Sequence, residues 1–169
     1  KYREELLWNK YQAGRNAINK YRNNPPYAYI VPTQQRDPGT AAEMLRRLAF
    51  NGVRVSQLDK DAIHDGVKYP AGTWVIPMDQ EYAELVRQLF EPQDYPDLRE
   101  YPDGPPDQPY DAAGWTLPYQ MDVHVIEARA PLSAVFRASL KPVQGKPVDW
   151  HTAPDAPFAL FALGRSVGW

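Results

Sequence analysis

The sequence predicts an α/β fold: a small, mostly parallel sheet built from strand–helix–strand units, with an N-terminal helix and a long, ordered, proline-rich wrap. Segments 27–31 and 53–58 have strand patterns, and the amphipathic segment between them has a helix pattern. Such a unit closes as a right-handed parallel crossover. The wrap at 92–118 is rich in proline but keeps large aromatic side chains, which a flexible linker does not need.

We divide the chain into four parts. Residues 1–24 form an N-terminal helix that connects to a preceding domain, 25–91 form the α/β core unit, 92–118 form the wrap, and 119–169 form a second, truncated α/β part. This last part ends where its strand–helix–strand unit would close, so we expect the natural protein to continue. We also expect Trp115 to be buried and to anchor the far end of the wrap.

The first two helices have recognisable ends. Apolar residues recur at helical spacing over 2–22, and Pro25 ends this helix because proline cannot continue one. Asp37 is a suitable N-cap for the second helix, and Pro38 suits its first position. Gly52 supplies the C-terminal stop.

The elements that follow are shorter. A hairpin is expected over 63–77, with its turn at 69–72. Residues 80–90 form a short helix, and 121–128 form another strand.

Composition excludes several classes of function. The net charge of −2 provides no basic field for nucleic acid. The absence of cysteine excludes disulfides, thiolate metal sites and a cysteine nucleophile. No apolar run approaches the roughly 20 residues that span a bilayer.

One pattern raises the question of a zinc site. His124 and Glu127 have the spacing of a His-x-x-Glu pair, and His151 is available as a third ligand. Positions three apart on a strand point to opposite faces, so the two side chains would diverge. We therefore expect no metal in this chain.

A second candidate site lies where the first predicted strand leads into a helix. Gln35, Arg36 and Asp37 precede that helix, whose free N–H groups favour an anion, although Asp37 already fills the cap with a negative charge. Aromatic residues provide a possible carbohydrate or peptide groove, with core packing as the alternative: Trp74, Tyr82, Trp115, Tyr119 and Trp150. The ligand-binding candidates are Gln35, Arg36, Trp74 and Trp115.

Four blocks of sequence, 29–38, 69–76, 89–99 and 109–121, resemble the region that follows the catalytic domain in large bacterial zinc carboxypeptidases of the carboxypeptidase A type. The most specific string is Pro109-Tyr110-Asp111-x-Ala113-Gly114-Trp115-Thr116-Leu117-Pro118. The resemblance implies a non-catalytic accessory domain that packs on the preceding peptidase domain. It also implies an exported protein, periplasmic or extracellular, whose zinc is held by the catalytic domain. No matching zinc ligand occurs here.

Two other interpretations stay open. One is an independent module that binds a small ligand or peptide in the crevice near Gln35 and Arg36, since open α/β sheets bind ligands at strand ends. The other is a free-standing hydrolase that uses His124, Glu127 and His151.

Overall fold

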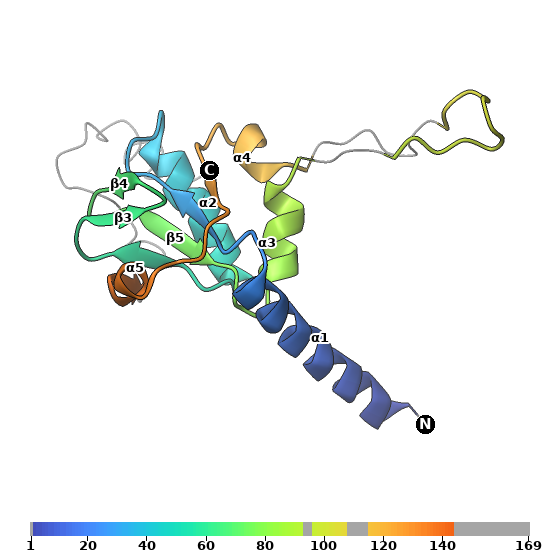
Figure 1. Cartoon of the computed structure of the whole chain (residues 1–169), viewed down its shortest axis with the longest axis horizontal. Coiled ribbons are helices and arrows are strands. Elements are labelled where there is room, and N and C mark those ends of the chain that lie inside the picture. Colours follow the sequence, from blue (N-terminus) through green and yellow to red (C-terminus); the bar gives the residue numbers. More distant parts are fainter. Residues whose placement is uncertain (1, 93–95, 108–114, 144–169) are drawn as a thin grey trace, which may run out of the picture.

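The computed structural model describes residues 2–92, 96–107 and 115–143 (Figure 1). Its centre is a five-stranded sheet in the order β6-β1-β5-β2-β7, accompanied by a β3–β4 hairpin. The strands are β1 Ala28–Val31, β2 Ser56–Leu58, β3 Ala62–His64, β4 Val67–Tyr69, β5 Trp74–Pro77, β6 Ile126–Ala128 and β7 Leu140–Pro142. The helices are α1 Arg3–Asn23, α2 Pro38–Phe50, α3 Ala83–Phe90, α4 Leu117–Gln120 and α5 Ala134–Ala138.

The fold is mixed α and β, but the prediction of a mostly parallel sheet is wrong. Every neighbouring pair in the five-stranded sheet is antiparallel. Strands β1 and β2, which α2 connects, run in the same direction because both are antiparallel to β5. The predicted strand–helix–strand unit is therefore present, but β5 separates its two strands.

A local return of the chain explains the position of β5. The backbone N–H of Leu58 donates to the carbonyl of Thr73 at 2.9 Å, and the N–H of Gly72 donates back to the carbonyl of Leu58 at 2.8 Å. These bonds place β5 beside β2 as soon as the β3–β4 hairpin ends. A short return closes at lower entropic cost than a long one, so β5 occupies the position that the parallel prediction gave to β1.

The hairpin is also displaced from its predicted turn. The turn lies at Asp65 and Gly66, whose φ angles are 49° and 76°. Two central residues with positive φ define a type I′ turn, for which Asp-Gly is a preferred pair. The segment 69–72 forms a second turn that leads into β5.

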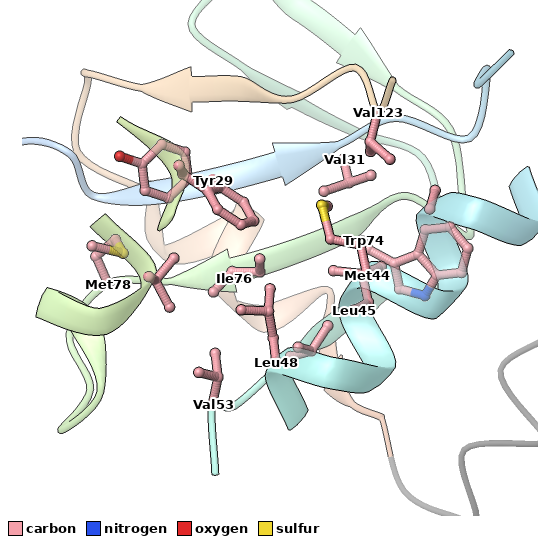
Figure 2. Packing of buried hydrophobic residues seen from close by; sticks show 14 of the residues in the cluster. Tyr29, Val31, Met44, Leu45, Leu48, Val53, Trp74, Ile76, Met78 and Val123 are labelled. Atoms are coloured by element: carbon pink, nitrogen blue, oxygen red, sulfur yellow. The ribbon is translucent and has the colours of Figure 1, made fainter. Parts of the chain in front are cut away.

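The sheet is covered on both faces because side chains alternate along its strands. Tyr29 and Val31 of β1, with Trp74 and Ile76 of β5, pack against α2 and α3 (Figure 2). Ile30, together with other residues of the opposite face, packs against the hairpin and α5. This two-sided burial makes β1 apolar along its whole length.

The described portion of the predicted second α/β part joins the sheet of the core unit. Its described strands β6 and β7 are the two edges of the same sheet, pairing with β1 and β2. They join this sheet because β1 and β2 otherwise each have one unpaired edge. The rest of this predicted part, 144–169, lies outside the described residues.

Helix α2 begins as predicted. The Asp37 carboxylate accepts from the N–H of Gly39 at 2.8 Å and of Thr40 at 3.2 Å, and from the Thr40 hydroxyl at 2.7 Å. These bonds, led by the one from the hydroxyl, lower the pKa of Asp37 below its ordinary value. Asn51 caps the other end, and Gly52 follows with a φ of 91°.

We expect Asp37→Ala to lower the free energy of unfolding by about 0.5–2 kcal/mol at neutral pH. Because the folded-state pKa is lowered, the ionised cap contributes above the unfolded-state pKa of about 4, and this contribution is lost as pH falls through the folded-state value. Urea unfolding of both proteins at several pH values measures this. An equal difference at all pH values would rule out the charge of Asp37 as the stabilising element.

His64 is a buried histidine that the sequence did not single out. It is 6% exposed, its ring centroid lies 5.3 Å from that of Phe136 in α5, and its Nε2 has no hydrogen-bond partner within the described residues. Burial lowers the pKa of His64. The neutral ring is therefore the form that fits between the hairpin and α5.

We expect stability to depend on pH through His64. A folded-state pKa below the unfolded value of about 6.5 means that the unfolded chain takes up the proton first, so stability decreases as pH falls below that value. Urea titrations from neutral to mildly acidic pH test this. The free energy of unfolding should change less steeply with pH in His64→Phe than in wild type. If the pH dependence is unchanged, other groups cause the acid sensitivity.

Helix α1 is present as predicted, but only its C-terminal end packs on the body. Ala17 and Tyr21 are buried, and the Tyr21 hydroxyl donates to the Glu84 carboxylate in α3 at 3.0 Å. Towards the N-terminus the helix projects away from the sheet (Figure 1). There Leu7 and Tyr11 are 62% and 54% exposed.

The two described stretches of the predicted wrap differ, since 96–107 project away from the body whereas 116–118 pack against it. Residues 96–107 form a projecting loop closed by a bridge between Arg99 and Pro106 (Figure 1). Trp115 is 48% exposed, so its predicted burial is wrong. The neighbouring Thr116 is buried and donates its hydroxyl to the Glu91 carbonyl at 3.2 Å. This bond and the packing of Leu117 and Pro118, rather than the indole, hold the end of the segment near α3.

Candidate functional site

A hollow of about 280 Å³ lies at the end of β1, where the predicted ligand site was placed. It forms where the chain leaving β1 meets α4 and the segment that leads into β6. Its lining residues are Gln35, Arg36, Pro118, Tyr119, Asp122, Val123 and His124. The tertiary structure thus brings Gln35 and Arg36 close to His124, which is distant in sequence.

Gln35 has a structural role at this hollow. Its amide nitrogen donates to the carbonyls of Pro32 and His124, both at 2.9 Å, and its carbonyl oxygen accepts from the backbone N–H of His124 at 2.8 Å. The side chain therefore pairs with His124 as a strand residue would. Both amide hydrogens are used, so Gln35 retains only acceptor capacity for a ligand.

Arg36 is charge-compensated. Its guanidinium forms an ion pair with the Asp122 carboxylate, and the two side chains are 85% and 66% exposed. An exposed pair of this kind contributes about 0–1 kcal/mol. An anion in the hollow would have to compete with Asp122, so the predicted anion site is not preformed.

The candidate zinc ligands do not converge within the described residues. His124 is exposed and precedes β6. Glu127 lies in β6, opposite Tyr29 across the ladder, and its carboxylate pairs with Arg129 at 3.2 Å. His151 lies outside the described residues. Among the described residues, no three side chains of His, Cys, Asp or Glu are grouped to hold a metal.

We expect the chain to retain no stoichiometric zinc after dialysis against a weak chelator. The physical reason is that catalytic zinc needs three converging ligands, whereas His124 and Glu127 do not converge and Glu127 is paired with Arg129. Elemental analysis of the dialysed protein measures this. One zinc per chain that is lost in His124→Ala would contradict the prediction.

The described aromatic residues named for a possible groove lie in different surroundings. Trp74 is 2% exposed and belongs to the core, whereas Trp115 and Tyr82 are each 48% exposed. Of the described members of this set, only Tyr119 lines the hollow at Gln35. Trp150 lies outside the described residues. Burial decides which aromatic side chains belong to the core and which can contact a ligand. The local sequence around each one does not show how deeply it is buried.

A larger hollow of about 540 Å³ lies between the end of α2 and the β2–β7 edge. Two arginines line it, and each has an acidic partner. Arg54 pairs with Glu81 at 2.7 Å, and Arg137 pairs with Asp79 at 3.0 Å. The hollow therefore presents little uncompensated charge to a ligand.

Sequence reasoning missed the structural role of Gln80. It is 1% exposed, and its carbonyl oxygen accepts from the N–H of Arg54 at 2.7 Å. Its amide donates to the carbonyls of Arg54 and Pro77. No local pattern marks such a glutamine, because its partner is distant in sequence.

The N-terminal part of α1 is a candidate binding surface of another kind. Together with its N-cap residue Tyr2, it carries five large apolar side chains that are 54–66% exposed: Tyr2, Leu6, Leu7, Trp8 and Tyr11. The rings of Trp8 and Tyr11 lie 5.5 Å apart, and the Arg15 guanidinium lies 5.7 Å from the Tyr11 ring. An apolar concentration on a projecting helix is typical of a protein-binding surface.

Comparisons with known proteins place no further constraint on these sites. No family model, curated protein or solved structure matches the chain. Across the described ranges, every helix is too short or too polar to cross a bilayer. The functional assignment therefore depends on the residues described above.

Proposed function

We propose that the chain is a non-catalytic accessory domain of a bacterial zinc carboxypeptidase-like protein, and that α1 packs on the peptidase domain. The observation that carries this proposal is the exposed apolar surface of α1. The four sequence blocks that resemble the region after the peptidase domain support the choice of protein. Zinc would then belong to the peptidase domain, and the whole protein would be exported.

The energetics of α1 support a missing contact. None of the side chains from 3 to 16 is buried. Isolated helices of this length are marginal in water, and most helical stability comes from packing. No salt bridge among the described residues stabilises this part of the helix. A partner surface would supply the packing that the body of this chain does not.

The polar residues support a structural rather than a catalytic role. Gln35 holds the backbone of His124, and Arg36 pairs with Asp122. Ser133 caps α5 by accepting from the N–H of Phe136 at 3.1 Å. Each of these groups already has a defined function in the fold.

The proposal is tested on the complete gene product. Its reading frame should encode, before this chain, a His-x-x-Glu motif and a later histidine. Hydrogen exchange should then show 3–16 protected in the complete protein and exchanging freely in the 169-residue chain. Helix α2, which is buried in both, is the internal control. Equal exchange of 3–16 in both proteins, or no preceding peptidase domain, would contradict the proposal.

The hollow at Gln35 favours a second candidate function, an independent module that binds a small ligand or peptide. Arg36, Tyr119 and His124 are exposed around it. Screening small anions and short peptides against wild type and Arg36→Ala tests this function. Specific binding that Arg36→Ala abolishes, together with unprotected α1 in the complete protein, would favour the module over the accessory domain.

A further inference from the structure

The apolar residues of α1 follow a heptad-like spacing. Leu7, Tyr11, Gly14, Ile18 and Tyr21 are separated alternately by four and three residues. We call this row the seam. At its C-terminal end Tyr21 is buried against the body, whereas Leu7 and Tyr11 remain exposed. One continuous helical stripe is therefore covered at one end and uncovered at the other.

Basic residues border the seam on both sides. Arg3 and Lys10 lie in the row on one side, and Arg15 and Arg22 lie with Trp8 in the row on the other side. All four cations are exposed, and none of them forms a salt bridge within the described residues. These two rows are the positions that choose the partner when two helices pack along such a seam.

We propose that the exposed part of the seam binds a helix whose own apolar seam is flanked by Asp and Glu. The alternating spacing fits a helical partner, since packing at a shallow crossing angle uses this geometry. The basic borders select carboxylates through charge complementarity. This inference rests on the proposed function, because it places the partner helix in the preceding domain.

A second copy of the chain is a poorer occupant. In a parallel pair, Lys10 of one copy would face the row that contains Arg15 of the other. In an antiparallel pair, each basic row would face its own equivalent. Like charges meet in both arrangements, and like-charge contacts oppose association.

The test uses the full 169-residue chain and two designed helical peptides of about three heptads. Both peptides carry leucine along the seam, one with glutamate and the other with lysine in the bordering rows. Binding is followed by the anisotropy of a dye on the peptide. The glutamate peptide should bind at least about tenfold more tightly than the lysine peptide, and its affinity should decrease as salt is added.

Matched variants assign the binding to the seam. Leu7→Ala should weaken binding of the glutamate peptide by about tenfold or more. Leu6→Ala removes a similarly exposed side chain that lies off the seam, so it should weaken binding less. Lys10→Gln with Arg15→Gln should reduce both the affinity and its salt dependence. Asn9→Glu with Asn16→Glu makes the same change in net charge on the opposite face and should have a smaller effect.

Each outcome discriminates between the possibilities. Equal binding of the two peptides, or equal effects of Leu6→Ala and Leu7→Ala, would overturn the inference. So would self-association of the chain through Leu7 in analytical ultracentrifugation, because a second copy would then be the occupant.

If the glutamate peptide binds as expected but 3–16 exchanges freely in the complete gene product, the seam inference stands and the accessory-domain proposal fails. Protection of 3–16 in the complete protein, with no preference between the peptides, would support the accessory domain and overturn the seam inference.

Discussion

Trp74→Ala is expected to lower the free energy of unfolding by about 3–5 kcal/mol. Trp74 is 2% exposed in β5, where it lies between Val31 of β1 and Gln57 of β2 in the strand register. Its indole packs on the face of the sheet that α2 covers (Figure 2). Removing it leaves a cavity that this central position cannot easily close, because strands pair on both sides of β5.

Trp115→Ala is the matched control, since it deletes the same side chain from a position that is 48% exposed. We expect an effect of about 1 kcal/mol or less, as for most changes away from the core. Urea unfolding followed by circular dichroism measures both variants against wild type. A larger loss for Trp115→Ala than for Trp74→Ala would show that the wrap, not the sheet, contains the dominant core.

Gln80→Met is expected to lower the free energy of unfolding by about 2–4 kcal/mol, because the variant keeps the volume but leaves buried backbone groups unpaired. The wild-type amide bonds to the N–H and the carbonyl of Arg54 and to the carbonyl of Pro77. These bonds fix the extended segment before β2 against the segment that follows β5. Without them, water has little access to replace the lost partners, since Gln80 is 1% exposed.

Gln35→Met provides the comparison, because Gln35 makes the same kind of pairing with the backbone of His124 at the more exposed hollow. Water can hydrate the released groups there, so we expect a loss of about 1 kcal/mol. The urea midpoints of the two variants give both losses of stability, provided that the dependence of the unfolding free energy on urea concentration is the same as in wild type. Equal losses in the two variants would show that exposure does not control the effect. A null result for Gln80→Met would mean that the Arg54 backbone finds other partners.

The elements that the sequence predicted well are those whose signals are local. The Asp37-Pro38 start of α2, its Asn51-Gly52 end and the apolar strand β1 each depend on a few adjacent residues. The hairpin turn differs from the prediction although Asp65-Gly66 is also a local signal, because the proline-containing segment 69–72 carries a competing turn signal and forms a turn as well. Gln35 and Arg36 line a hollow at the end of β1, and the step from a strand to a helix that marks this place is itself a local feature.

The features that the sequence could not predict all depend on contacts between distant segments. The pairing of Gln35 with His124 and of Gln80 with Arg54 has no pattern in the chain, and neither does the difference in burial between Trp74 and Trp115. The same holds for the exposure of the seam. The seam has the same spacing along the whole of α1. Which of its residues are buried depends on how much of the helix packs against the body.

The sequence by itself determined the segments of α1, α2, α3 and β1, the absence of thiol chemistry and the apolar stripe of α1. Only the tertiary structure decided the antiparallel strand order, the edge positions of β6 and β7, and the uncovered end of the seam. Propensities and caps act within about one turn of helix or a few residues of strand, so they are encoded where they act. Strand order depends instead on which distant segments pair and on the entropic cost of closing the loops between them. Several strand orders are compatible with the same local pattern.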